Sequence, residues 1–124
     1  MILAPISVGE LIDKITILEI KMLMIKNPEK LLNVTKELTA LNQIYLENLN
    51  KSYELIKLKN SLYQVNQELW YIEDYKRACE QTQNFDLVFI EAARNVYLKN
   101  DLRASIKREI NSLTGSTIVE VKSY

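Results

Sequence analysis

The sequence predicts an all-α protein, built as an antiparallel bundle of about four long helices. Apolar residues recur at alternating spacings of three and four along most of the chain, which is the pattern of helices with a buried face. Glycine and proline, which interrupt helices, occur only twice each. With 124 residues, 48% of them hydrophobic, the chain is long enough for one core and too short for two. We therefore expect a single helical domain over residues 1–124.

The first two helices are predicted from their caps and apolar rows. Ser7 and Glu10 have the spacing of a capping box, so a helix should begin at about Val8. Its apolar residues form two rows, which predicts that it packs on more than one side. Pro28 ends this segment and suits the first turn of a second helix, which runs to about Asn48 with one apolar face.

The third and fourth helices follow in the same way. The longest helix should run from near Tyr53 to about Cys79. Because only a short polar turn precedes it, we expect it to form a helical hairpin with the second helix. Asp86 can cap a fourth helix, in which a change of phase near Asn100 predicts a kink or a restart. Gly115 is a natural stop.

The two ends of the chain form a further expectation. Residues 117–121 are rich in β-branched side chains and are expected to be extended. Their only plausible partner is the apolar stretch 2–6. The two segments are therefore predicted to lie together as a short strand pair.

The absence of certain residues excludes several classes of function. The chain has no histidine, one cysteine and only two glycines, so histidine-based catalytic triads, zinc sites and glycine-rich phosphate loops are excluded. Its 16 basic and 16 acidic side chains cancel, which argues against nucleic acid as a partner. A single cysteine, the lack of a signal-like start and the charges within its most apolar stretch predict a cytoplasmic protein without membrane contact.

Several segments resemble a known family. They are SVGELIDKITILEIK at 7–21, LWYIED at 69–74, FIEAARNVYLKNDLRASIKREIN at 89–111, and a GS followed by KSY at the end of the chain. Together they resemble an uncharacterised family of short bacterial and phage proteins, classed as a domain of unknown function. The resemblance implies an association with surface-polysaccharide or glycosyltransferase functions. It carries no catalytic residue, because none is assigned in the family.

Charged side chains on rows that should be buried are the candidates for a ligand site, because a buried charge requires a partner. They could converge on a polar cleft, or each could form a structural ion pair. The basic ones also form a stripe on the fourth helix that would suit an anionic ligand. The candidates are Asp13, Glu19, Glu73, Arg94, Lys99, Arg103 and Lys107.

Two functions are compatible with these observations. The first is a binding or interaction protein, expected to be a homodimer, that recognises a protein partner or an anionic or saccharide-type ligand without a cofactor. The alternative is a Mg²⁺-dependent all-α nucleotide pyrophosphohydrolase, whose helices would present acids to the metal. Whether the protein is an enzyme stays open, and the missing motifs favour a binding role. The metal candidates of the alternative are Glu10, Asp13, Glu68, Glu73 and Asp74.

Overall fold

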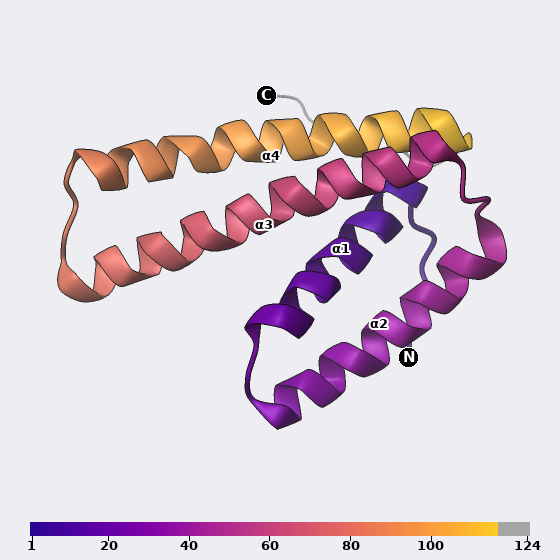
Figure 1. The fold of residues 1–124 in the computed structure, drawn as a ribbon, viewed down its shortest axis with the longest axis horizontal. Helices are drawn as coiled ribbons and strands as arrows, with labels where there is room; N and C mark the ends of the chain where they lie inside the picture. The colour runs from indigo at the N-terminus through magenta and orange to yellow at the C-terminus, as the bar shows by residue number, and fades with distance from the viewer. Residues whose placement is uncertain (117–124) are drawn as a thin grey trace.

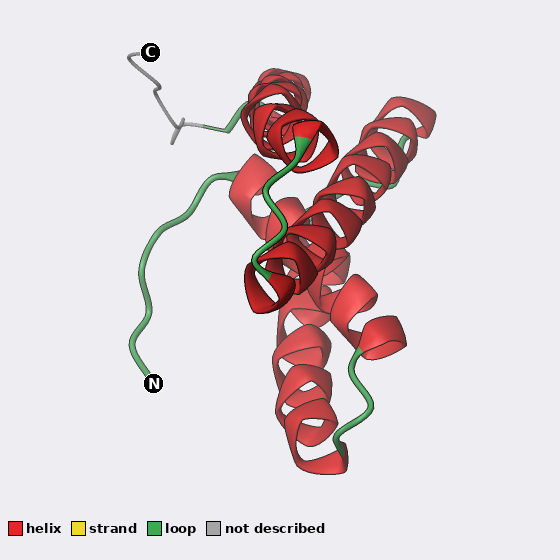
Figure 2. Ribbon diagram, turned by 90° about the vertical axis from the view of Figure 1, so that its left-hand side faces the viewer, coloured by secondary structure: helices red, strands yellow, loops and turns green. Residues whose placement is uncertain are grey.

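The computed structural model describes residues 1–116, which form four helices joined by short connections (Figures 1 and 2). No strand occurs in this part of the chain, so the all-α prediction is confirmed. The predicted pairing of the two ends involves residues 117–121, which lie outside the described residues. None of the described helices combines the length and apolar content needed to cross a membrane. The helices are α1 (Val8–Met24), α2 (Pro28–Asn48), α3 (Tyr53–Thr82) and α4 (Leu87–Thr114).

Helices α1 and α4 begin at the predicted caps, Ser7 and Asp86. The Ser7 hydroxyl accepts a hydrogen bond from the Glu10 amide at 3.1 Å, which satisfies one of the free amides of the first turn of α1. Asn27, Ser52 and Asp86 cap the other three helices in the same way. At the end of α4, Gly115 has a φ of 68°, the left-handed conformation that glycine adopts without strain.

The helices pair differently from the prediction. Figure 1 shows two antiparallel hairpins, one of α1 and α2 and one of α3 and α4, which cross at an angle. Helix α1 contacts all three other helices, whereas the backbone of α2 comes close to that of α1 alone. The predicted hairpin of the second and third helices is therefore wrong. Its physical reason is the pair of apolar rows on α1, which lets this helix pack between α2 and the α3–α4 hairpin.

Helix α4 runs from Leu87 to Thr114 without the predicted break near Asn100. The shift of the apolar row around the helix near Asn100 has another cause. Before Asn100, α4 has no buried residue, whereas its buried residues Ala104, Ile106 and Ile110 lie in the half that contributes to the core with α1 and α3. The apolar row shifts because the neighbours change, while the backbone stays helical.

The core lies where the first half of α1 meets the start of α3 and the end of α4. The side chains of Ile12, Ile15, Leu55, Leu62 and Ile110 are at most 1% exposed. Burial of side chains of this size contributes about 1.5–3 kcal/mol each. One end of the α3–α4 hairpin is therefore fixed to α1, and the other end extends beyond it (Figure 1).

Gly9 allows α1 and α4 to approach closely. A Cβ atom at this position would lie 2.6 Å from the backbone carbonyl oxygen of Lys107 and 3.0 Å from Oδ1 of Asn111. Real Cβ atoms do not approach a backbone oxygen so closely, and a backbone oxygen cannot rotate away as a flexible side chain can. Only glycine fits at this crossing point.

We predict that Gly9→Ala destabilises the protein by about 2 kcal/mol, because α1 must move away from α4. Helix propensity alone would give the opposite sign, a stabilisation of up to about 1 kcal/mol. Urea unfolding followed by circular dichroism measures the difference. Gly115→Ala is the comparison, because that position is open and should lose only about 1 kcal/mol from its positive φ. An increase in the stability of Gly9→Ala would contradict the close approach.

Candidate functional site

Asp13 and Arg103 form a buried ion pair between α1 and α4. The Asp13 side chain is 1% exposed, and both of its carboxylate oxygens accept hydrogen bonds from the Arg103 guanidinium. The Nε–Oδ1 distance is 2.8 Å. A bidentate contact of this kind fixes the orientation of both groups, and it compensates for the removal of the two charges from water.

Helix α3 completes the hydrogen bonding of this pair. The amide nitrogen of Asn66 donates to Oδ1 of Asp13 at 2.9 Å and to the Thr16 hydroxyl at 3.0 Å. Thr16 in turn donates to the backbone carbonyl of Asp13 at 2.8 Å. Among the described residues, no buried side-chain nitrogen or oxygen atom lacks a hydrogen-bond partner. The cluster therefore joins α1, α3 and α4 and satisfies its own polar groups.

A second polar contact lies one to two turns away, at the start of α1. The Lys107 ammonium donates to Oε2 of Glu10 at 2.7 Å, although Lys107 is only 6% exposed. Oδ1 of Asn111 accepts from the Gly9 amide at 2.7 Å. The amide of Val8 donates to the Ser116 hydroxyl at 3.3 Å. The first two amides of α1 are thus occupied by Ser116, which follows the C-cap of α4, and by Asn111 of α4.

The structure brings only some of the predicted ligand residues together. Of the basic stripe on α4, Arg103 and Lys107 contact acids of α1, and Lys99 contacts Glu68 of α3 at 2.5 Å. The basic stripe is therefore matched by acids of the same chain, which lie on α1 and α3. The remaining candidates are spread over the molecule: Glu19 lies 3.9 Å from Lys59, Glu73 lies 3.6 Å from Lys76, and Arg94 is exposed on α4.

The metal candidates do not converge either. Glu10, Asp13, Glu68 and Glu73 each face a basic side chain, and Asp74 is exposed. Within residues 1–116, no three aspartate, glutamate, histidine or cysteine side chains lie close enough to hold a metal ion. The geometry of this region offers the pyrophosphohydrolase alternative no metal site.

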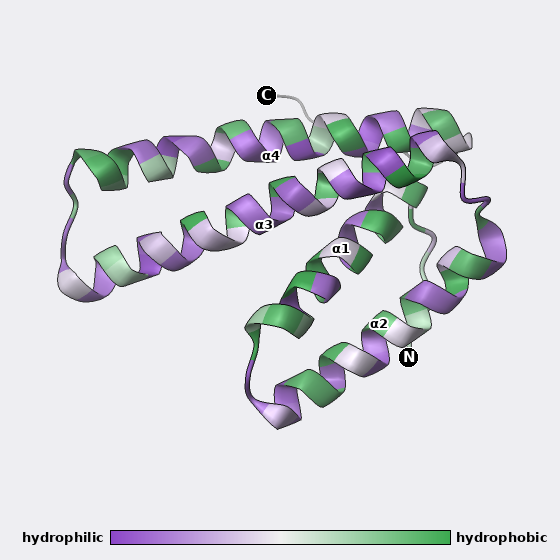
Figure 3. Ribbon diagram, in the orientation of Figure 1, coloured by the Kyte–Doolittle hydropathy of each residue, from purple (hydrophilic) through white to green (hydrophobic). Residues whose placement is uncertain are grey.

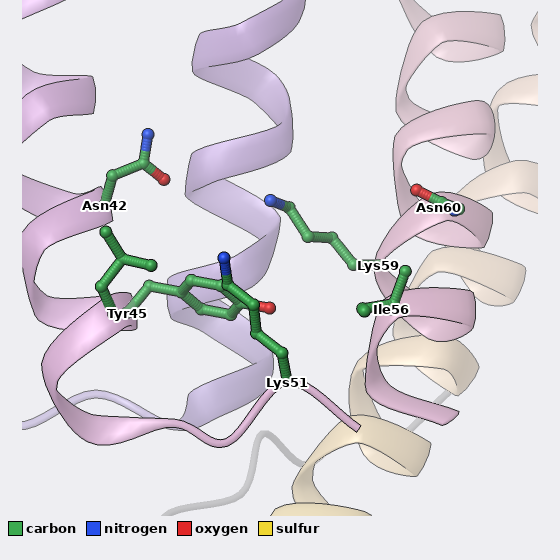
Figure 4. Close-up of a pocket in the computed structure, with 7 residues that line it drawn as sticks. Asn42, Tyr45, Lys51, Ile56, Lys59 and Asn60 are labelled. Atoms are coloured by element: carbon green, nitrogen blue, oxygen red, sulfur yellow. The ribbon is translucent and has the colours of Figure 1, made fainter. Parts of the chain in front are cut away.

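A shallow groove lies between α2 and α3, where the two backbones stay apart. Figure 4 shows Lys59 reaching from α3 toward α2. Its ammonium lies 5.0 Å from the centre of the Tyr45 ring and makes no hydrogen bond among the described residues. Burial raises the pKa of Tyr45 above its ordinary value and the charge of Glu19 adds to this, so the hydroxyl stays protonated at neutral pH. The groove has a volume of about 380 Å³ and is lined by Asn42, Tyr45, Leu46, Lys51, Ile56, Lys59 and Asn60.

The far end of the α3–α4 hairpin, residues 70–102, is the second feature of interest, because it contributes little to the core beyond the partly buried Val96. We call it the arm. Cys79 is its only buried residue. Figure 3 shows hydrophobic residues at its tip, where α4 begins. Its exposed apolar side chains are Tyr71, Tyr75, Phe85, Leu87, Val88, Ile90, Tyr97, Leu98 and Leu102.

Two crossed helical hairpins, joined by buried ion pairs and extended by an arm, define a small all-α protein without a metal-binding cluster in its described part. The chain belongs to a family of unknown function, DUF6165, which it matches over residues 2–124. The resemblance to a family of unknown function is thereby confirmed. No curated protein and no solved structure matches the chain.

Sequence reasoning missed several residues of these sites. Asn66 lies one turn after Leu62 on the buried row of α3, so a polar residue within an apolar row was the available signal. Thr16 is likewise a polar residue among apolar ones, because it lies in the most apolar stretch of the chain. Lys59 and Asn111 show no comparable pattern, because their roles depend on helices that are distant in sequence.

We predict that Arg103→Met lowers the free energy of unfolding by about 3–5 kcal/mol, because the Asp13 carboxylate stays buried without its cation. The double variant Asp13→Leu with Arg103→Met should recover part of this loss, since it removes the unpaired charge. Urea unfolding gives these values. Arg108→Met is the matched control on the exposed face of α4 and should stay within about 0.5 kcal/mol of the native chain. A similar small loss for Arg103→Met would show that the pair is not buried in solution.

Proposed function

We propose that the protein is a helical interaction protein that binds a protein partner through its arm. The observation that carries this proposal is the exposure of apolar side chains on an arm in which only Cys79 is buried. Leu87 is 78% exposed, Val88 59% and Tyr97 54%. Clustered exposed apolar residues mark interaction sites, because water contact with each of them is unfavourable.

The amino acids of the arm also suit an interface. Tyrosine is enriched in protein–protein interfaces because it contributes a large contact area together with one hydroxyl group. Tyr71, Tyr75 and Tyr97 are exposed on the arm. The side chains of the arm stand mainly on two helices, so a partner does not need to order a disordered backbone there when it binds.

The polar cluster around Asp13 is a less suitable binding site than the arm, and this difference supports the proposal. Its charges are matched within the chain, so a ligand would have to break these pairs before it could bind. The apolar side chains of the arm are only partly covered within the chain, as in the edge-to-face contact of Phe85 with Phe89. A partner that covers the arm removes their remaining exposed area from water.

We predict that a photo-crosslinking amino acid at Tyr97 in the full chain captures a defined protein inside the cell. The same amino acid at Leu32, which is 57% exposed on α2, is the matched control and should give no adduct. Mass spectrometry identifies the captured partner. The proposal requires the same adduct from a second arm position, Leu87. Equal adducts at Leu32 and Tyr97, or none at either arm position, would contradict it.

A second candidate function concerns the groove between α2 and α3. We propose that it binds an anionic, hydroxyl-rich small molecule such as a nucleotide sugar. Lys51 and Lys59 supply two cations, and the Asn42 and Asn60 amides and the Tyr45 hydroxyl supply hydrogen bonds. The ammonium of Lys59 has donors to spare, because Glu19, the acid that it faces within residues 1–116, lies 3.9 Å away.

We predict that UDP-glucose at hundredfold excess over its Kd raises the melting temperature by at least about 5 °C. The shift should disappear in Lys59→Ala, because this ammonium lies at the centre of the groove. Lys36→Ala removes an exposed charge of α2 outside the groove and should keep the shift. Inorganic phosphate in a parallel titration separates recognition of the phosphate from recognition of the sugar. No shift with either probe, or an equal shift in Lys59→Ala, would exclude the groove as this binding site.

A further inference from the structure

The outer face of the arm carries a row of four exposed residues on α4. Leu87, Glu91, Arg94 and Leu98 follow one another at spacings of four, three and four residues. These spacings keep them within about 60° of one another around the helix axis. Leu87 is 78% exposed and Leu98 48% exposed. Glu91 and Arg94 are exposed as well, and neither forms an ion pair with another described residue.

The row is symmetric about its own centre. The midpoint between Leu87 and Leu98 is also the midpoint between Glu91 and Arg94. A twofold axis at this point would place each leucine opposite the other leucine of a second helix. It would also place each glutamate opposite an arginine.

Self-complementarity of this kind is what a twofold interface needs, because the same surface must serve as both partners. A helix that runs parallel to α4 would meet like charges at these positions, so the row favours the antiparallel orientation. Ile90 and Tyr97 lie on one flank of the row, seven residues apart and centred one residue further along. They add apolar area beside the leucines, and both are about half exposed.

We infer that the arm binds a second copy of this chain, with the two α4 helices antiparallel and the contacts Leu87–Leu98 and Glu91–Arg94 each made twice. This inference rests on the proposed function and specifies its partner. Two arms paired in this way bury the Leu87–Leu98 row of each α4 against the other copy, with each α3 on the outer side of its own α4. The zero net charge of the chain allows the approach of two identical molecules.

Sedimentation equilibrium of the full chain tests the inference, because a charge exchange distinguishes this interface from unspecific apolar association. The native chain should be a dimer at micromolar concentration. Glu91→Arg and Arg94→Glu should each weaken the dimer by roughly tenfold or more, because each places like charges opposite one another twice. The double exchange should restore most of the affinity. Circular dichroism verifies that each variant is folded.

The matched control is Glu37→Arg, which changes an exposed acid of α2 and should leave the dimer unchanged. A native chain that is monomeric up to about 100 μM overturns the inference, since its Kd would then exceed useful concentrations. Failure of the double exchange to recover the affinity also overturns it. An adduct between the arm and a different protein, found with a monomeric native chain, would keep the proposed function and exclude the second copy.

Discussion

The fold depends on the contact between the first turns of α1 and the last turns of α4. Gly9 allows the two backbones to approach, and the pair of Asp13 and Arg103 lies one turn further along. These residues are about a hundred positions apart in sequence, so their contact closes a long loop at an entropic cost. Burial of the neighbouring isoleucines offsets that cost. Because a shift between the helices would leave a buried charge unpaired, the ion pairs fix the register of α1 against α4.

The length of α1 determines how much of the molecule has a core. Its 17 residues extend over about 26 Å, whereas the 30 residues of α3 extend over about 45 Å. Helix α1 is therefore too short to cover the whole α3–α4 hairpin, and it also packs on α2. The arm follows directly from this difference in length. It is held at its base by Lys99 and Glu68, and its far end depends on contacts between two helices alone.

The sequence predicted the helices better than their arrangement. Caps such as Ser7 and Asp86 act within a few residues, so the spacing of the sequence identifies them. The pairing of helices depends on which apolar faces meet, and a short connection between α2 and α3 was a poor guide to it. The basic stripe on α4 was visible as a pattern, but nothing in one sequence shows that acids of α1 and α3 lie opposite it. That Arg103 and Lys107 form ion pairs became visible only in the structure, where the crossing of the two hairpins places acids of α1 opposite them.

We locate the function where side chains are exposed although the folding of one chain does not require them to be apolar. The cluster around Asp13 uses its hydrogen bonds internally, and its residues are explained by folding alone. The exposed leucines of the arm are different, since a polar residue at Leu87 or Leu98 would leave the core of a single chain intact and would reduce contact between apolar groups and water. The folding of one chain therefore gives no physical reason for these leucines. A partner that covers the arm gives one, because the same side chains then contribute to binding through the area that they bury.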